Sequence, residues 1–148
     1  MAAAGGSLAL ILGALAFQYI GGILPCKMCY WQRYPHYLAI VIGALALWLG
    51  GRVLAYLGAA AAATTAAIGL FHTGVERGWW EGPASCTGSG AGLGGLSGSD
   101  LLSTDGPVGI VMCDEVAWSM LGLSMASWNA IFSAGLVLLW LAAARRAA

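Results

Sequence analysis

Residues 30–71, YWQRYPHYLAIVIGALALWLGGRVLAYLGAAAAATTAAIGLF, contain two long apolar runs separated only by a turn of Gly50, Gly51 and Arg52. Two further apolar runs flank them, one near the start of the chain and one near its end. Each run is close to the roughly 20 residues with which a helix crosses a hydrocarbon core of about 30 Å. Because only a helix satisfies its backbone groups within one such segment, the sequence predicts an all-α, four-helix transmembrane bundle. We expect a single domain with spans at about residues 8–24, 30–50, 53–71 and 118–143.

The composition places the chain in a membrane. Of its 148 residues, 60% are hydrophobic and only 8% are charged, and the mean hydropathy is +0.83. Soluble domains are about a quarter charged. The formal net charge is zero and there is no basic stripe, which argues against a nucleic acid as partner. The first run could instead be a cleaved signal peptide, but residues 1–7 contain no Lys or Arg, and three further spans follow.

The spacing of the runs predicts which segments share a side of the membrane. The second and third runs are joined by a tight turn, whereas residues 72–117 separate the third run from the fourth and hold all six acidic residues. This stretch is rich in Gly and Ser at 87–106, so we expect one long, flexible loop there. An even number of spans puts both termini on one side and the long loop on the other.

The orientation follows weakly from charge and more clearly from cysteine. Three basic residues lie on each side, so the positive-inside rule decides little. All four cysteines lie on the side of the long loop, and disulfides are favoured outside the cytosol. We therefore expect both termini to be cytoplasmic and the cysteine loops to be periplasmic.

Four cysteines in two pairs indicate thiol chemistry at the membrane surface. Cys26 and Cys29 form a CxxC motif directly after Pro25, which suits the start of a helix, and Cys86 and Cys113 lie in the long loop. Free N–H groups at a helix start favour a thiolate, which is the nucleophile in disulfide exchange. Spacing alone leaves two other interpretations open. The loop pair could be a static disulfide, or the cysteines could bind zinc, although a second pair spaced by 27 residues matches no common zinc site.

Polar residues near the CxxC motif are candidate binding residues. Arg33 follows Cys29 by four residues on one helical face, where a guanidinium could hold a thiolate, a lipid phosphate or a polar ligand. Together with the helix start, it leads us to expect the lowered pKa at Cys29. Gln18 is polar within the first span and either bonds to a neighbouring helix or faces a ligand. His36 and His72 lie near span ends, where an isolated histidine is usually just a wetted polar tip.

Motifs spread over nearly the whole chain form a specific pattern. They are Pro25-Cys26-x-x-Cys29 with Gln32-Arg33, Gly82-Pro83-Ala84-Ser85-Cys86, and Cys113-Asp114-Glu115-Val116 continuing as Leu121-Gly122-Leu123-Ser124-Met125-Ala126-x-Trp128-Asn129. The pattern resembles the DsbB family, the disulfide bond formation proteins of bacterial inner membranes. In that family the DsbA–DsbB–quinone relay keeps the periplasm oxidising.

The resemblance implies a direction of electron flow. Cys86 and Cys113 would form the disulfide that oxidises a DsbA-like thioredoxin-fold protein, and Cys113 would then exchange with Cys26. Cys29 would pass the electrons to a quinone, either ubiquinone or menaquinone. This quinone would belong to the quinone pool in the membrane lipid. The four cysteines are therefore the expected catalytic residues of a monomeric protein-dithiol:quinone oxidoreductase.

The resemblance also implies a set of quinone-binding residues. Arg33 matches the quinone-binding arginine of the family. Gln18 and His72 fall near polar positions close to the quinone in relatives, and His72 aligns with an offset of one residue. No metal site is expected.

Two alternatives to this function are kept. The first is an enzyme like vitamin K epoxide reductase, which also couples a helical bundle, four cysteines and a quinone. In that family the quinone-facing CxxC lies late in the chain, whereas here it follows the first span. The second is a non-enzymatic metal-binding membrane protein. Quinone reduction by a reduced DsbA-like protein would separate the three.

Overall fold

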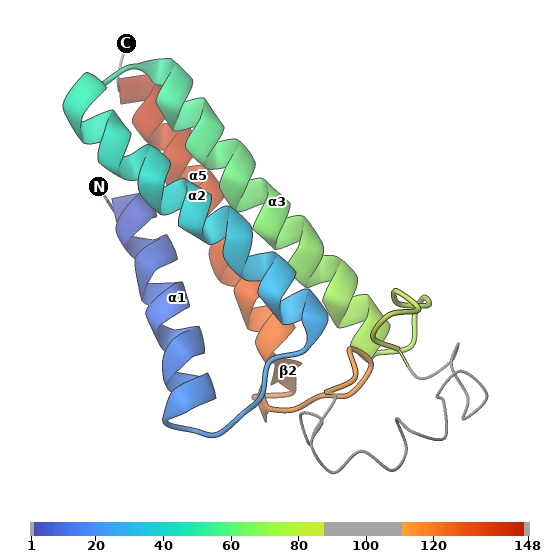
Figure 1. The fold of residues 1–148 in the computed structure, drawn as a ribbon. Helices are drawn as coiled ribbons and strands as arrows, with labels where there is room; N and C mark the ends of the chain where they lie inside the picture. The colour runs from blue at the N-terminus through green and yellow to red at the C-terminus, as the bar shows by residue number, and fades with distance from the viewer. Residues whose placement is uncertain (1, 88–110, 147–148) are drawn as a thin grey trace.

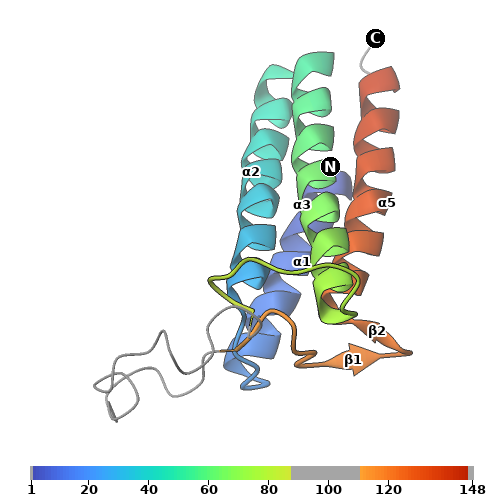
Figure 2. The same cartoon turned by 90° about the vertical axis from the view of Figure 1, so that its right-hand side faces the viewer.

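The computed structural model describes residues 2–87 and 111–146. Within them, four long helices lie side by side, and a small antiparallel sheet precedes the last helix (Figures 1 and 2). The elements are α1 (Ala2–Tyr19), α2 (Lys27–Leu49), α3 (Arg52–Glu76), β1 (Ser119–Met120), β2 (Leu123–Ser124) and α5 (Met125–Arg146). The prediction of an all-α, four-helix bundle is confirmed.

Three of the described helices have the length and hydropathy of a membrane span. These are α1, α3 and α5, with mean hydropathies of 1.5, 1.7 and 1.6 over their most apolar windows. α2 is long enough, at 23 residues, but its first half contains Gln32, Arg33 and His36. All three of these side chains are buried, because α2 turns this polar face toward the other helices. α2 therefore lies in the bundle with a polar stripe on its inner side.

The helices differ from the predicted spans at several ends. α1 begins at Ala2 and ends at Tyr19, so residues 20–24 of the expected first span form a connection instead. α3 continues past residue 71 to Glu76. α5 begins at Met125 and not at residue 118, because residues 119–124 form a hairpin. Its turn holds Leu121 and Gly122, both with positive φ, and such two-residue turns match the twist of paired strands.

α3 is the centre of the bundle and packs most extensively on α5 and α2. Its contact faces are built from small residues, as is usual where membrane helices approach closely. Gly58 illustrates the constraint, since a Cβ built there would come within 2.5 Å of the Trp140 ring of α5. Close packing of this kind fixes the position of α3 against α2 and α5, and so fixes the polar residues that the three helices share.

The two ends of the bundle differ in character. Both termini lie toward the end that carries the α2–α3 turn, and the connections with the cysteines lie at the opposite end (Figures 1 and 2). The predicted flexible stretch, residues 87–106, lies outside the described residues apart from Thr87.

Candidate functional site

The CxxC motif lies at the start of α2, as the sequence predicts. Cys26 is the residue that caps the helix and has an extended backbone, and its sulfur accepts a hydrogen bond from the backbone N–H of Cys29 at 3.3 Å. The Sγ atoms of Cys26 and Cys29 lie 3.1 Å apart, and neither is in a disulfide. Cys26 is buried, and Cys29 is half-buried. The two thiols are therefore within reach of each other at the head of the helix.

The other two cysteines are joined by a disulfide between Cys86 and Cys113, the pairing that the resemblance implied. A backbone hydrogen bond of 2.5 Å from the N–H of Cys113 to the carbonyl of Cys86 supports it. Both cysteines are buried, because they pack with Cys26, Met28 and Val75 in one cluster. The two cysteine pairs thus occupy a single site.

His72 and Glu76 bring a base and an acid to this site from the end of α3. His72 Nε2 lies 3.6 Å from Cys26 Sγ and 3.8 Å from a carboxylate oxygen of Glu76. The His72 ring also donates toward the backbone of Cys113. His72 therefore lies between one cysteine of each pair.

Among the cysteines of the reduced CxxC, Cys26 forms the thiolate. A hydrogen bond from the Cys29 thiol, helped by His72 and by the Cys29 N–H, outweighs burial and lowers the pKa of Cys26 to about 4. The expectation of a lowered pKa at Cys29 is wrong for this state, because Cys26 holds the capping position. Moreover, the guanidinium of Arg33 binds Gln18.

We predict that alkylation of Cys26 in the reduced protein stays fast from neutral to mildly acidic pH. A lowered pKa keeps the thiolate above about pH 4, and the rate should fall only as the pH drops through that value. The measurement is the rate of iodoacetamide labelling across a pH series, with Cys26 and Cys29 resolved by peptide mass spectrometry. A midpoint near the ordinary thiol value of about 8.5 would contradict the assignment.

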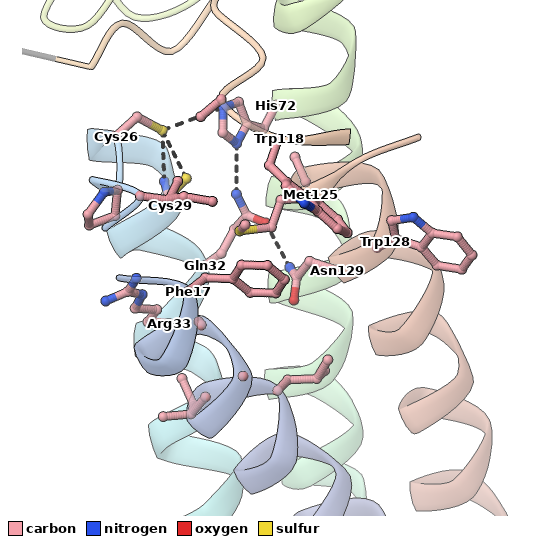
Figure 3. Close-up of a pocket in the computed structure, with 18 of the residues that line it drawn as sticks. Phe17, Cys26, Cys29, Gln32, Arg33, His72, Trp118, Met125, Trp128 and Asn129 are labelled. Atoms are coloured by element: carbon pink, nitrogen blue, oxygen red, sulfur yellow. Dashed lines mark hydrogen bonds between the residues drawn. The ribbon is translucent and has the colours of Figure 1, made fainter. Parts of the chain in front are cut away.

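A cavity of about 400 Å³ lies beside the CxxC motif, between α1, α2, α3 and α5 (Figure 3). Its volume is in the range of about 300–1,000 Å³ that is usual for small-molecule sites. The walls are mainly apolar, with Phe17, Trp118 and Phe132 among them. The polar lining residues are Cys26, Cys29, Gln32, Arg33, His36, His72, Glu76, Glu115 and Asn129. The cavity can therefore take an apolar molecule with a few polar atoms directed at the cysteines.

Arg33 and Gln18 meet as a pair. The Arg33 guanidinium donates a hydrogen bond of 2.6 Å to the side-chain oxygen of Gln18, and it lies 5.0 Å from the ring centre of Tyr30. Arg33 lines the cavity, whereas Gln18 is not among the lining residues. Gln18 thus contacts the cavity only through Arg33, whose charge it orients.

Cys26, Cys29 and His72 also offer three potential metal-ligating atoms within 4.8 Å of one another. Two of these atoms are thiol sulfurs, which suit a soft ion such as zinc. Oxidation to a Cys26–Cys29 disulfide would remove both of them. The set is therefore compatible with an ion only in the dithiol state.

Sequence reasoning missed three polar residues of this site. Gln32, His36 and Asn129 line the cavity and are joined by hydrogen bonds across helices, and Gln32 also reaches His72. A signal was present, because polar side chains within spans are costly and tend to be functional. Gln32 and His36 are four residues apart on one face of α2. Asn129 has only Ser127 and Ser133 as polar neighbours within the first turns of α5, so the packing of α5 is needed to reveal its partners on other helices.

Comparison with known proteins gives a consistent result. Residues 1–143 match the family model described as "Disulfide bond formation protein DsbB". The chain is 36% identical to Disulfide bond formation protein B of Verminephrobacter eiseniae over 90% of its own length and 77% of the relative's. It is 35% identical to the protein of that name from Methylococcus capsulatus, over 86% and 81% of the two chains. It is 32% identical to Disulfide bond formation protein B of Azoarcus sp., over 93% of this chain and 87% of the relative. No solved structure shows a significant match.

Proposed function

The chain belongs to the DsbB family and is a membrane disulfide-generating oxidoreductase that acts on thiols, and on this premise we propose that it re-oxidises a periplasmic DsbA-like protein and passes the electrons to a membrane quinone. The observation that supports the proposal best is the single cluster that holds both cysteine pairs next to an apolar cavity. Disulfide exchange needs neighbouring sulfurs, and a lipid-soluble acceptor needs an apolar site.

The first part of the reaction is thiol–disulfide exchange with the partner. A thiolate of the reduced partner attacks Cys86, forms a mixed disulfide and displaces Cys113 as a thiolate. The second thiolate of the partner then attacks its own sulfur in the mixed disulfide and releases Cys86. The partner leaves as a disulfide, and its two electrons remain on Cys86 and Cys113. Because both sulfurs are buried, the loop that carries them has to open for this attack.

The second part is exchange within the chain. The Cys113 thiolate attacks Cys26 of an oxidised Cys26–Cys29 pair and displaces Cys29 as a thiolate. Cys86 then attacks Cys113, which restores the loop disulfide and releases Cys26. The described structure has the loop disulfide and a free Cys26 and Cys29, which is the arrangement expected after this exchange. The cap at the head of α2 stabilises the Cys26 thiolate and makes it a good leaving group.

The residues of the cavity fit a quinone. The walls are apolar, the volume accommodates a substituted ring, and Cys29 and Arg33 both line the cavity. A bound quinone supplies a two-electron acceptor that becomes a quinol when it takes up two protons. Arg33 would bind it through the guanidinium, with Gln18 behind Arg33 and His72 on the side of Cys26. The apolar walls would exclude water from the thiols.

The arrangement in the membrane is part of the proposal. We place the cysteine end of the bundle in the periplasm and both termini in the cytoplasm of a bacterial cell. Support comes from the preference of disulfides for oxidising compartments, since the basic residues are divided equally between the two ends. We also propose that the chain works as a single domain and as a monomer.

We predict that Arg33→Ala raises the KM for quinone by roughly ten- to a hundredfold, since a hydrogen bond to a charged group is worth about 1.5–3 kcal/mol. The KM for the DsbA-like partner should change much less. Steady-state kinetics with each substrate varied in turn give both values. Arg33→Lys, which keeps the charge, should lie between the two proteins. An unchanged KM for quinone would leave Arg33 with a lipid-anchoring role.

The proposed function is tested with the purified chain in detergent. Reduced DsbA-like protein and either a ubiquinone or a menaquinone analogue are added, and quinol formation is followed by absorbance. We expect one quinol for each disulfide formed in the partner. Quinone reduction with small thiols but not with the DsbA-like protein would favour the enzyme like vitamin K epoxide reductase. Stoichiometric zinc binding without any quinone reduction would favour the metal-binding alternative.

A further inference from the structure

A chain of hydrogen bonds joins the middle of the bundle to Cys26. It crosses from α2 to α5, back to α2 and then to α3, and its last three links are visible in Figure 3. The successive distances are 3.0 Å from His36 Nε2 to Asn129 Oδ1, 2.7 Å from Asn129 Nδ2 to Gln32 Oε1, 2.9 Å from Gln32 Nε2 to His72 Nδ1, and 3.6 Å from His72 Nε2 to Cys26 Sγ. Such a chain can run in either direction, depending on how its amides and rings are turned.

The backbone of α2 fixes the direction at Gln32. The side-chain atom of Gln32 that faces His72 also lies 3.2 Å from the backbone carbonyl of Met28. A carbonyl oxygen only accepts hydrogen bonds, so the atom beside it is the amide nitrogen and not the amide oxygen. Gln32 therefore donates to Met28 and to His72, and its oxygen faces Asn129.

A second and independent constraint fixes the direction at Asn129. The Thr65 hydroxyl, which is fully buried, donates its one proton to the backbone carbonyl of Gln32 at 3.0 Å. Its oxygen can then only accept from the side chain of Asn129, which lies 3.2 Å away. The atom of Asn129 that faces Thr65 is therefore the nitrogen, and the same nitrogen donates to Gln32. The two constraints agree on one direction.

This direction determines which nitrogen of His72 carries a proton. Because Gln32 donates to Nδ1, Nδ1 has no hydrogen, and the single proton of the ring is on Nε2. Nε2 faces Cys26, with Glu76 slightly farther away, and the ring also donates toward the backbone of Cys113. His72 is thus a neutral ring that donates toward the sulfur. An imidazolium would need an acceptor at Nδ1, and the structure places a donor there.

We propose that Asn129 and Gln32 are positioning residues that hold His72 as the neutral Nε2–H tautomer, so that it donates to the Cys26 thiolate and does not take up its proton. Neither residue touches Cys26, and each acts through His72. The other groups that face Cys26 are Cys29 on α2, Glu76 on α3 and the Cys86–Cys113 disulfide of the loops. The proposal deepens the proposed function, because it concerns the thiolate of the same site.

Burial makes this constraint effective. Gln32, Thr65 and His72 are at most 5% exposed, so each is held mainly by its protein neighbours. In such surroundings an unsatisfied donor or acceptor is costly, and the members of a network orient one another. Turning Gln32 would set two carbonyl oxygens against each other at Met28. The tautomer of His72 is therefore determined by its neighbours on α2, α3 and α5.

The test measures the tautomer directly in the full-length protein in detergent, with Cys26 and Cys29 reduced and the Cys86–Cys113 disulfide intact, and without quinone or protein partner. The chain has two histidines, so ¹⁵N-histidine labelling gives two ring spin systems, which one replacement of His36 assigns. We expect His72 with an unprotonated Nδ1 and a protonated Nε2. In Asn129→Leu and in Thr65→Val this preference should be lost. In the same two variants the pH midpoint of Cys26 alkylation should rise by about one unit or more. This corresponds to a tenfold or greater change in the equilibrium between thiolate and thiol at Cys26, as expected when the hydrogen bond from His72 to the thiolate is weakened.

Matched variants keep the result interpretable. Thr64→Val makes the same change at the adjacent residue, whose hydroxyl bonds to Ala60 on the exposed face of α3, and it should leave His72 as it is. Thr65→Ser retains the hydroxyl and should behave like the unchanged protein. A protonated Nδ1 in the unchanged protein would overturn the proposal even if no variant folds. So would a tautomer and an alkylation profile that Asn129→Leu and Thr65→Val leave unaltered. No quinone is present in these measurements, so their outcome does not depend on whether the protein reduces quinone.

Discussion

Cys86→Ser is expected to abolish oxidation of the DsbA-like partner while leaving the Cys26–Cys29 pair able to exchange electrons with quinone. In the proposed reaction the partner's thiolate attacks Cys86 of the loop disulfide, and serine offers no sulfur to form the mixed disulfide. The CxxC pair is held at the head of α2 and keeps its cap, its cavity and its neighbour His72. Partner oxidation is measured by thiol labelling, and quinone reduction is measured with a small dithiol as donor.

A neighbouring residue gives the control for this variant. Ser85 is exposed and precedes Cys86, so Ser85→Ala changes the same turn without removing a sulfur. It should oxidise the partner normally. Full turnover of the partner by Cys86→Ser would mean that the thiols of the partner attack the Cys26–Cys29 pair directly, and the proposed order of the two cysteine pairs would be wrong.

Burial of the loop disulfide adds a step that the sequence did not predict. Cys86 and Cys113 lie against Met28 and Val75, where a protein thiolate cannot reach them. The same packing places them beside Cys26, which suits exchange within the chain. One arrangement therefore favours the internal step and hinders the external one. In the proposed reaction, the loop disulfide therefore has to become exposed before the partner attacks it.

Hydrophobic runs predicted the fold class, but they did not predict where the helices end. Residues 20–24 and 119–124 are apolar enough to extend a span, yet they form a connection and a hairpin. Gly22 and Gly122 adopt positive φ at these places, and hydropathy does not report backbone conformation. Turn residues were the better indicator of the ends.

The site was predictable to the extent that it is local in sequence. The CxxC motif, the start of α2 and Arg33 follow from spacing along one helix. The partners of Arg33 and Cys26 do not, because Gln18 and His72 come from other helices and become neighbours only through packing. Asn129 lies 97 positions from Gln32 in sequence and still donates to it. Which cysteine forms the thiolate depends first on the hydrogen bond between Cys29 and Cys26 within the motif and then on His72 from α3.

Cys29→Ala is expected to limit the protein to a single turnover. The loop disulfide is still present, so each molecule should oxidise about one equivalent of the DsbA-like partner through Cys86. No Cys26–Cys29 disulfide can form again, since a disulfide needs two sulfurs, and the electrons cannot leave the loop pair. Steady-state quinone reduction should therefore fall to the uncatalysed level. A rapid-mixing experiment that counts partner disulfides against time shows the burst and its end.

Lys27→Ala is the matched control for Cys29→Ala, because Lys27 lies within the same motif and is exposed. It should turn over repeatedly, which separates the loss of a sulfur from a disturbed helix start. The burst also distinguishes Cys29→Ala from Cys86→Ser, which should show no burst. Continued turnover by Cys29→Ala would place the electron exit at another residue. Absence of the burst would mean that the loop disulfide cannot open to the partner without an intact CxxC pair, because the four cysteines form one packed cluster.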